Sequence, residues 1–388
     1  MTPRRSRGRR LVLVAVAAVA LLLAACSGVK NNGQNSLQPK SPQAQKIYDL
    51  FVPILIIAII VGIAIIIATV TLAIKFRYKK DKNENPKQIH GNTRLEIGWT
   101  ILPALLLAII AVPTVATIFD LAENPGPQAL QVNVEGKQWW WQFSYPDAKV
   151  VTADEMVIPT GRDVFLHLRA CDGTSDTPDT CNVIHSFWVP ELSGKKDVVP
   201  GQANTLTISA DKPGTYLGQC AEYCGLSHAN MRFRVIAKSP ADFQQWLSEQ
   251  QQGPVNPLTE PDPNDSSKQI PAGPTQELLV NSKNFGCVNC HVFDDSSKAS
   301  YGPNLTHLAS RSTFASGTYP LTRANLINWV KDAPSMIPMS SQGCRLPPGQ
   351  GICVGMPSFT TNTPTSGGYQ SMTQQQAEDI ADFLLEQK

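Results

Sequence analysis

The sequence lacks a surplus of charge of either sign. Its 388 residues include 33 lysines and arginines against 31 aspartates and glutamates, which leaves a formal net charge of +2. A protein that binds nucleic acid needs a concentrated basic surface, because it must neutralise many phosphates. The composition therefore excludes nucleic acid as the expected partner.

An even number of cysteines is also lacking. Because there are nine, they cannot all pair with one another, and their positions divide them among different roles. Cys26 stands alone, and the others form the neighbouring pairs Cys171 and Cys181, Cys220 and Cys224, Cys287 and Cys290, and Cys344 and Cys353. Two of these pairs have spacings that suit metal or haem chemistry. The other two suit short disulfide loops, which indicates an oxidising compartment outside the cytoplasm.

A single-domain architecture is excluded by length. Domains cluster at roughly 100–150 residues, and two folded units with membrane segments account for 388 residues. Many of the 30 prolines fall between the expected units, as they do in linkers.

The N-terminus has the pattern of a bacterial lipoprotein signal. A basic head precedes an apolar stretch over residues 11–25, and Leu-Ala-Ala-Cys at residues 23–26 resembles a lipobox. The alternative, an uncleaved transmembrane helix, is disfavoured because the apolar core is shorter than the roughly 20 residues of a span. We expect a signal peptide over residues 1–25, a lipid on Cys26 and an extracytoplasmic segment over residues 26–49.

Two longer apolar segments, residues 50–74 and 99–119, each have the length and composition of a transmembrane helix. The loop between them, residues 75–98, carries seven basic residues against three acidic ones. By the positive-inside rule this loop faces the cytoplasm. The two helices therefore form a hairpin, and the rest of the chain lies outside.

The pattern changes after the second apolar segment. Residues 128–238 contain short alternating apolar runs broken by Gly, Pro, Asn and Asp, which predicts an all-β sandwich or barrel. Residues 239–273 are expected to form a short helix and then a flexible linker. Residues 274–388 contain helical patterns at both ends and in the middle, as expected for a small all-α domain around a large ligand.

Soft metal ligands are concentrated near the middle of the chain. Residues 220–231 hold two thiols, an imidazole and a thioether, and His185 offers a second imidazole from a neighbouring strand end. Sulfur and imidazole donors select copper or zinc, and the thioether of Met231 favours copper. Two cysteines four residues apart can bridge two metal ions. A disulfide or a structural zinc site would have no use for Met231.

These motifs resemble cytochrome c oxidase subunit II and its CuA cupredoxin domain. The resemblance rests on Cys-x3-Cys-x3-His-x2-Met, on His-Ser-Phe-Trp-Val-Pro-Glu-Leu at residues 185–192, and on the two preceding membrane helices. It implies a dinuclear copper centre whose ligands are His185, Cys220, Cys224, His228, Met231 and the backbone carbonyl of Glu222. It also implies that the Glu222 carboxylate faces a magnesium site at the boundary with subunit I.

The resemblance assigns roles to two further positions. Trp139 matches the family's residue where electrons enter from cytochrome c, in a run of three tryptophans that cannot all point inward because strand side chains alternate. Glu96 matches a glutamate at the mouth of a proton path into subunit I. The alternative for Glu96 is an ordinary interfacial acid, which the helix dipole also favours.

A second cofactor motif lies in the C-terminal region. Cys287, Cys290 and His291 form a C-x-x-C-H element, in which two thiols attach haem c and the histidine ligates iron. A redox-active disulfide would not need His291. Met356, in Gly-Met-Pro-Ser-Phe, best resembles the family's axial methionine; the alternatives are Met339, Met336 and Met372. Disulfides are expected between Cys171 and Cys181 and between Cys344 and Cys353.

Together these features predict a multidomain membrane protein with a two-helix transmembrane hairpin, an all-β cupredoxin-like domain and a small all-α cytochrome c domain. The resemblance implies subunit II of a respiratory haem-copper oxidase, in which electrons pass from haem c to CuA and on to subunit I for oxygen reduction and proton pumping. Implied partners are subunits I and III, a cytochrome c or cytochrome bc complex as donor, and the lipid of a bacterial cell membrane. Two alternatives are the CuA–haem c subunit of a nitric oxide reductase and a lipoprotein that binds copper for delivery or storage.

Overall fold

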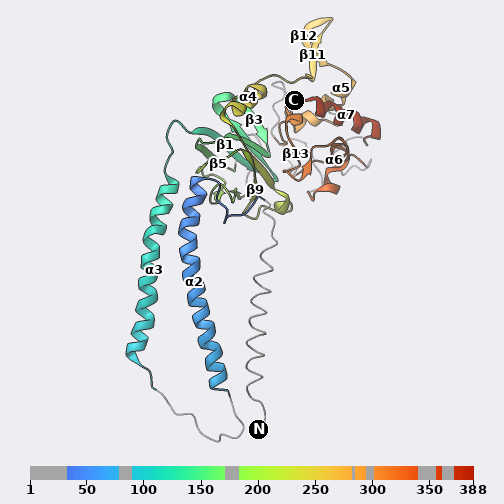
Figure 1. Cartoon of the computed structure of the whole chain (residues 1–388). Helices are drawn as coiled ribbons and strands as arrows, with labels where there is room; N and C mark the ends of the chain where they lie inside the picture. Colours follow the sequence, from blue (N-terminus) through green and yellow to red (C-terminus); the bar gives the residue numbers. More distant parts are fainter. Residues whose placement is uncertain are drawn as a thin grey trace.

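The computed structural model describes residues 33–77, 90–170, 183–281, 285–293, 301–339, 355–360 and 371–388. In these ranges two long helices extend from a β-domain, and a mostly helical C-terminal domain lies beside that β-domain (Figure 1). The signal peptide, Cys26 and the four cysteines of the two expected disulfides lie outside the described residues.

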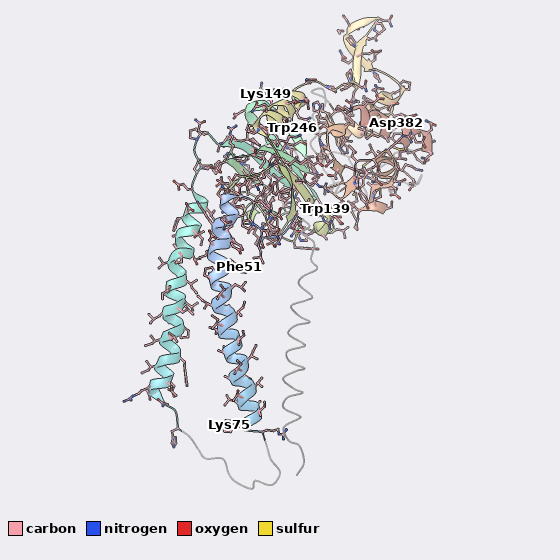
Figure 2. All side chains as sticks on the ribbon, in the orientation of Figure 1. Phe51, Lys75, Trp139, Lys149, Trp246 and Asp382 are labelled. Carbon is pink, nitrogen blue, oxygen red and sulfur yellow. The ribbon has the colours of Figure 1, made fainter. Side chains whose placement is uncertain are left out.

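The two long helices are α2 (Pro42–Lys75) and α3 (Thr93–Ala122). Each begins at a capping side chain: Ser41 accepts from the Ala44 N–H, and the Asn92 amide oxygen accepts from the first turn of α3. Both are long and apolar enough to cross a membrane, and most of their large apolar side chains are exposed (Figure 2). A helix of 34 residues is about 51 Å long, so α2 spans a bilayer and also reaches the β-domain. The expected spans, 50–74 and 99–119, lie within these helices.

The β-domain is a sandwich of two five-stranded sheets, with strand orders β3-β2-β1-β5-β8 and β4-β10-β9-β6-β7. The strands of the first sheet are β1 (Leu130–Lys137), β2 (Trp140–Tyr145), β3 (Val150–Ala153), β5 (Val164–Arg169) and β8 (Asn204–Ile208). The strands of the second are β4 (Glu155–Pro159), β6 (His185–Trp188), β7 (Lys196–Val198), β9 (Gly214–Cys220) and β10 (Arg232–Lys238). The pairs β1·β5 and β4·β10 are parallel, and the other pairs are antiparallel.

Aromatic side chains fill the space between the two sheets. Trp141, Phe143, Phe187 and Phe233 are almost completely buried, and the rings of Phe187 and Phe233 stack with centroids 4.6 Å apart. Gly218 pairs with Phe233 across β9 and β10, and a Cβ at Gly218 would lie 2.3 Å from the Phe233 ring. The core therefore requires glycine at that position.

Helix α4 (Pro240–Gln250) closes one end of the sandwich, and the Trp246 ring lies 5.3 Å from that of Tyr145. The residues expected as a structureless linker contain a hairpin, β11 (Thr259–Asp262) and β12 (Asp265–Pro271). The composition that suggested a linker instead makes the hairpin turn, because the Asp262 carboxylate accepts from the Asn264 N–H at 2.7 Å.

The C-terminal domain is built from α5 (Pro274–Val280), α6 (Arg323–Met336) and α7 (Gln374–Glu386), with the small hairpin β13 (Thr313–Phe314) and β14 (Tyr319–Pro320). Helix α5 is a short helix of 7 residues, and α6 continues past a kink at Asp332. A capping box of Thr373 and Gln376 starts α7. Within the described ranges, short 3-10 turns are found at η1 (Pro146–Ala148), η2 (His228–Asn230), η3 (Cys287–Asn289) and η4 (Leu308–Ser310).

Candidate metal centre and adjoining pocket

The predicted copper ligands come together at one end of the second sheet. His185 begins β6, Cys220 ends β9, and Cys224, His228 and Met231 lie in the connection from β9 to β10. The two Sγ atoms are 3.8 Å apart, and the Cys220 Sγ is 3.9 Å from the His185 Nδ1. The Cys224 Sγ is 3.5 Å from the His228 Nδ1 and 3.7 Å from the Met231 Sδ. The Glu222 carbonyl oxygen is 3.2 Å from the Cys220 Sγ.

The donor set fits a metal centre. A disulfide needs about 2.05 Å between the sulfur atoms, and both thiols are free. Ligand atoms bound to one metal ion at roughly 2.0–2.3 Å lie about 3.3–3.8 Å from each other, and the neighbouring donors here are 3.2–3.9 Å apart. His185, Cys220 and Cys224 are buried and their ligating atoms lie within 4.8 Å of one another.

The two thiols titrate as a pair. The hydrogen bond with Cys224 lowers the pKa of Cys220, with a smaller contribution from His185. The same hydrogen bond, followed by burial and the charge of Cys220, raises the pKa of Cys224. The pair thus releases one proton readily and keeps the other until a cation compensates the second negative charge.

The backbone of β1 holds the His185 ring in place. A Cβ at Gly136 would lie 2.9 Å from this ring, and the Trp141 ring packs edge-on against it at a centroid distance of 5.9 Å. Both contacts come from the first sheet, so the packing of the two sheets orients a metal ligand.

Trp139 is bonded directly to the main chain of a copper ligand. Its Nε1 donates to the Cys224 carbonyl at 2.9 Å, and the Gln138 Nε2 donates to the same oxygen at 2.7 Å. Gly225 lies against both side chains with φ +110°, a conformation that favours glycine. The sequence interpretation missed Gln138, whose one signal is its place beside the tryptophan run.

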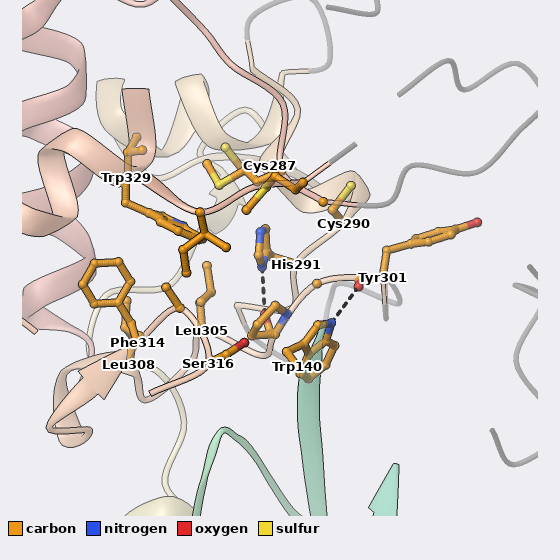
Figure 3. Close-up of a pocket in the computed structure, with 18 of the residues that line it drawn as sticks. Trp140, Cys287, Cys290, His291, Tyr301, Leu305, Leu308, Phe314, Ser316 and Trp329 are labelled. Atoms are coloured by element: carbon orange, nitrogen blue, oxygen red, sulfur yellow. Dashed lines mark hydrogen bonds between the residues drawn. The ribbon is translucent and has the colours of Figure 1, made fainter. Parts of the chain in front are cut away.

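Trp140 and Trp141, the first residues of β2, point to opposite faces as the alternation of strand side chains requires, and Trp139 lies in the turn before β2. Trp141 is completely buried in the sandwich, whereas Trp140 is covered by the C-terminal domain. The Trp140 Nε1 donates to the Tyr301 carbonyl at 3.3 Å (Figure 3). Trp139 and Trp140 therefore face the neighbouring domain.

A cavity of about 200 Å³ lies between the β-domain and the C-terminal domain, and residues of both domains line it. Cys287, Cys290 and His291 form part of its wall (Figure 3), while Trp139 and Trp140 reach it from the β-domain. Burial raises the pKa of Cys287 to about 12 and also raises that of Cys290. Both side chains therefore stay neutral thiols, unlike cysteines poised to bind a bare metal ion.

His291 is oriented as a metal ligand. Its Nδ1 lies 2.9 Å from the Pro303 carbonyl, which fixes the proton on Nδ1 and leaves the lone pair on Nε2. Burial lowers the pKa of His291, so the ring is neutral, as ligation requires. A Cβ at Gly302 would lie 2.5 Å from the ring. The loop that begins at Gly302 thus supports the histidine.

Two of the four candidate axial methionines line the cavity. Met339 and Met356 are in its wall, and a Cβ at Gly355 would lie 2.8 Å from the Met339 Sδ. Met372 instead packs in the domain core, and Met336 is not among the lining residues. The packing therefore narrows the choice to Met356 and Met339.

Two other histidine and glutamate positions lie away from these sites. Glu96 is exposed in the first turn of α3, the end of that helix remote from the β-domain (Figure 1). His307 is buried between the Lys388 and Gln252 carbonyls, 2.7 and 3.1 Å from its ring nitrogens. It anchors the C-terminus and is not among the residues that line the cavity.

Comparison with known proteins adds three similar chains. Residues 30–117 match the transmembrane domain of cytochrome C oxidase subunit II, and residues 177–238 match the periplasmic domain. A cytochrome c oxidase subunit 2 of Alkalihalophilus pseudofirmus is 36% identical over 323 residues, covering 82% of this chain and 86% of the relative. The cytochrome c oxidase subunit 2 of Bacillus subtilis is 32% identical over 348 residues, covering 85% of this chain and 90% of the relative. A quinol oxidase subunit 2 of Bacillus cereus is 35% identical over 221 residues, covering 56% of this chain and 72% of the relative.

Proposed function

Because the chain belongs to the cytochrome c oxidase subunit II family, we propose that it receives electrons at a haem c of its own and passes them through its copper site to subunit I. It is a subunit of a haem-copper cytochrome c oxidase, with two membrane helices and an extracytoplasmic copper domain that transfers electrons. The CuA site includes His185, Cys220, Cys224 and Met231. A dinuclear copper centre bound there supplies a carrier for single electrons.

The observation that carries this function is the convergence of two imidazoles and a thioether on a pair of thiols, with each donor within 3.9 Å of one thiol. We assign His228 and the Glu222 carbonyl to the same centre, because each lies beside one of the bridging thiols. The carboxylate of Glu222 accepts from the Tyr223 N–H at 3.2 Å. It is our candidate for a magnesium site at the boundary with subunit I.

Three features of the C-terminal domain support a covalent haem c. Neutral thiols and a neutral histidine share one cavity wall, and two methionines lie in the same wall. The alignment with the Alkalihalophilus subunit covers 82% of the chain, so it must extend into the C-terminal domain. When bound, the haem supplies an electron acceptor and donor, and a thioether ligand holds its potential higher than a second histidine would.

The geometry suggests where the electron passes. Trp139 lines the cavity and its indole donates to the Cys224 carbonyl at 2.9 Å. One side chain thus contacts both the proposed haem site and the main chain of a copper ligand. We assign it as the transfer point. For Glu96, at the cytoplasmic end of α3 in the expected topology, we keep the assignment to a proton path into subunit I.

Partners and location complete the proposal. The complex contains subunit I, and we add subunit III and a cytochrome c or cytochrome bc complex as donor. The protein lies in a bacterial cell membrane with both folded domains outside, and a lipid on Cys26 provides a third attachment. Oxygen reduction and proton pumping take place in subunit I.

The test uses the purified complex with the full chain. We expect a near-infrared band and a mixed-valence paramagnetic signal from the copper centre, a c-type haem spectrum, and a copper-to-haem c ratio of one dinuclear centre per haem. Oxygen uptake with reduced cytochrome c should exceed nitric oxide consumption. A complex that lacks the near-infrared band, or that consumes nitric oxide instead, would contradict the assignment.

A further inference from the structure

The turn between β3 and β4 presents two adjacent carboxylates to the C-terminal domain. Asp154 lies between the strands with φ +60°, a left-handed conformation that turns the chain sharply, and Glu155 begins β4. Each is only 4% exposed. Buried carboxylates are unfavourable unless hydrogen bonds compensate their lost hydration, so their partners define what this turn does.

Glu155 is bonded by the C-terminal domain. Its Oε1 accepts from the Ser312 N–H and hydroxyl, at 3.1 and 2.6 Å. The same oxygen accepts from the Thr313 N–H and hydroxyl, at 2.9 and 2.7 Å. Among the described residues, all donors found for this carboxylate come from residues 312 and 313. The carboxylate therefore serves the interface between domains and not its own sheet.

Asp154 bridges the two domains. One carboxylate oxygen accepts from the Trp141 N–H at 2.9 Å, and the other accepts from the Ser316 N–H at 3.1 Å. The guanidinium of Arg311 stabilises its negative charge, and Arg311 itself is in the cavity wall. The turn between β3 and β4 therefore binds residues 311–316 near both ends, through Glu155 at Thr313 and through Asp154 at Ser316.

The held segment ends on the electron-transfer residue. The Ser316 hydroxyl donates to the Trp139 carbonyl, while the Trp139 indole donates to the Cys224 carbonyl. We call the bonds of Asp154 and Glu155 to residues 311–316 the clamp. A further bond between the domains runs from the Arg234 guanidinium of β10 to the Thr313 hydroxyl. A continuous set of hydrogen bonds therefore runs from the carboxylate turn, through Ser316 and Trp139, to a copper ligand.

We propose that Asp154 and Glu155 are positioning residues that keep the C-terminal domain docked over Trp139, so that an external protein donor delivers electrons to the C-terminal domain and has no direct access to Trp139. This inference rests on the proposed function. Trp140, beside Trp139, is 7% exposed and bonded to Tyr301. The surface that would receive a soluble cytochrome is thus occupied by the chain's own domain.

The test follows electron transfer from haem c to copper in the full complex after photoreduction of the haem, with the near-infrared band as the copper readout. Glu155→Ala removes the acceptor for residues 312 and 313, and the transfer should slow by about tenfold or more, because hydrogen bonds to a charged acceptor are among the stronger ones. Glu155→Gln retains one acceptor oxygen and should recover part of the rate. Glu260→Ala, at an exposed position of β11, is the matched control and should leave the rate unchanged.

A second variant and a second measurement cover a folding defect in Glu155→Ala. Ser312→Ala combined with Thr313→Val removes the hydroxyl donors from the other side of the interface and should also slow the transfer. In the unmodified chain, the amides of Thr313 and Ser316 should be protected from hydrogen exchange. In the undocked variants, a soluble reduced cytochrome c should reduce copper without prior reduction of haem c.

Two results would overturn the clamp. One is rapid exchange of the Thr313 and Ser316 amides in the unmodified complex. The other is an unchanged transfer rate in both interface variants when both cofactor spectra are present. A missing copper or haem spectrum in the unmodified chain would instead contradict the proposed function. The hydrogen-exchange measurement would still show whether the C-terminal domain is docked on the β-domain.

Discussion

At the scale of single residues, Trp139 has two partners that belong to different domains. Its indole N–H is bonded to the Cys224 carbonyl, and its own carbonyl accepts from Ser316. The first contact depends on the indole side chain, and the second depends on the main chain alone. Through this double attachment the turn after β1 contacts both the copper site and the neighbouring domain.

The cavity gives a residue-level prediction about the axial ligand. Met356 is followed by a segment fixed to α6, because the Phe359 N–H donates to the Lys331 carbonyl at 2.9 Å. We expect Met356→Ala to abolish the sulfur-to-iron absorption band and to lower the haem potential by on the order of 0.1 V or more, since a thioether ligand raises the potential. A redox titration followed by visible spectroscopy measures both.

The matched control is Met339→Ala, which alters the same wall and should keep the band. If Met339→Ala removes the band and Met356→Ala keeps it, the two assignments must be exchanged.

At the scale of elements, the turn between β3 and β4 should make stability depend on pH. Burial raises the pKa of Asp154 from 3.8 to about 7, against the lowering effects of the Trp141 N–H and Arg311. Between these values the folded chain keeps a proton that the unfolded chain has lost. The free energy of unfolding should therefore fall as the pH rises, by roughly 4 kcal/mol at most, and this loss should be complete above about pH 7.

Thermal unfolding midpoints of the complex from pH 4 to pH 8 test this expectation. Asp154→Asn cannot ionise, so its midpoint relative to the unmodified chain should rise with pH over that interval. A constant difference between the two proteins would show that Asp154 is already ionised throughout it. Arg311 and Glu155 face this carboxylate and stay unchanged in both proteins.

Local patterns predicted some elements well and others poorly. Alternating apolar runs at residues 130–134, 139–145, 163–169, 205–209 and 231–237 predicted β1, β2, β5, β8 and β10. Helical patterns at residues 239–250 and 373–386 predicted α4 and α7 closely. The strand β4 was missed because all five of its residues are buried, so it shows no alternation. The hairpin of β11 and β12 was missed because its residues are polar, and its pairing rather than its composition forms it.

The two sites differ in what the sequence could predict. All the copper ligands except His185 lie within twelve consecutive residues, 220–231. A short motif of soft donors of this kind can be recognised from the sequence alone. The clamp depends on Asp154 and Glu155 meeting Ser312, Thr313 and Ser316, more than 150 residues later. No periodicity reports such a contact, because it arises from how two domains dock.

At the scale of the whole molecule, the helix hairpin fixes which parts lie on each side of the membrane. Arg77 lies just past the end of α2, and Ser266 lies on β12, at the opposite end of the molecule (Figure 1). In intact cells, a membrane-impermeant thiol reagent should label Ser266→Cys and leave Arg77→Cys unlabelled until the membrane is opened. The reverse pattern would invert the topology, since the excess of basic residues in the loop is its main support.

The connection between the two folded domains has a short reach. The Ala272 N–H donates to the Leu258 carbonyl at 3.0 Å, so everything between those residues is a closed side loop that adds nothing to the tether. Asn256 is in turn bonded to α7, through the Glu386 carboxylate at 2.8 Å. Even a momentarily separated domain would stay at an effective concentration of about millimolar, and re-docking would proceed equally fast however dilute the membrane population became.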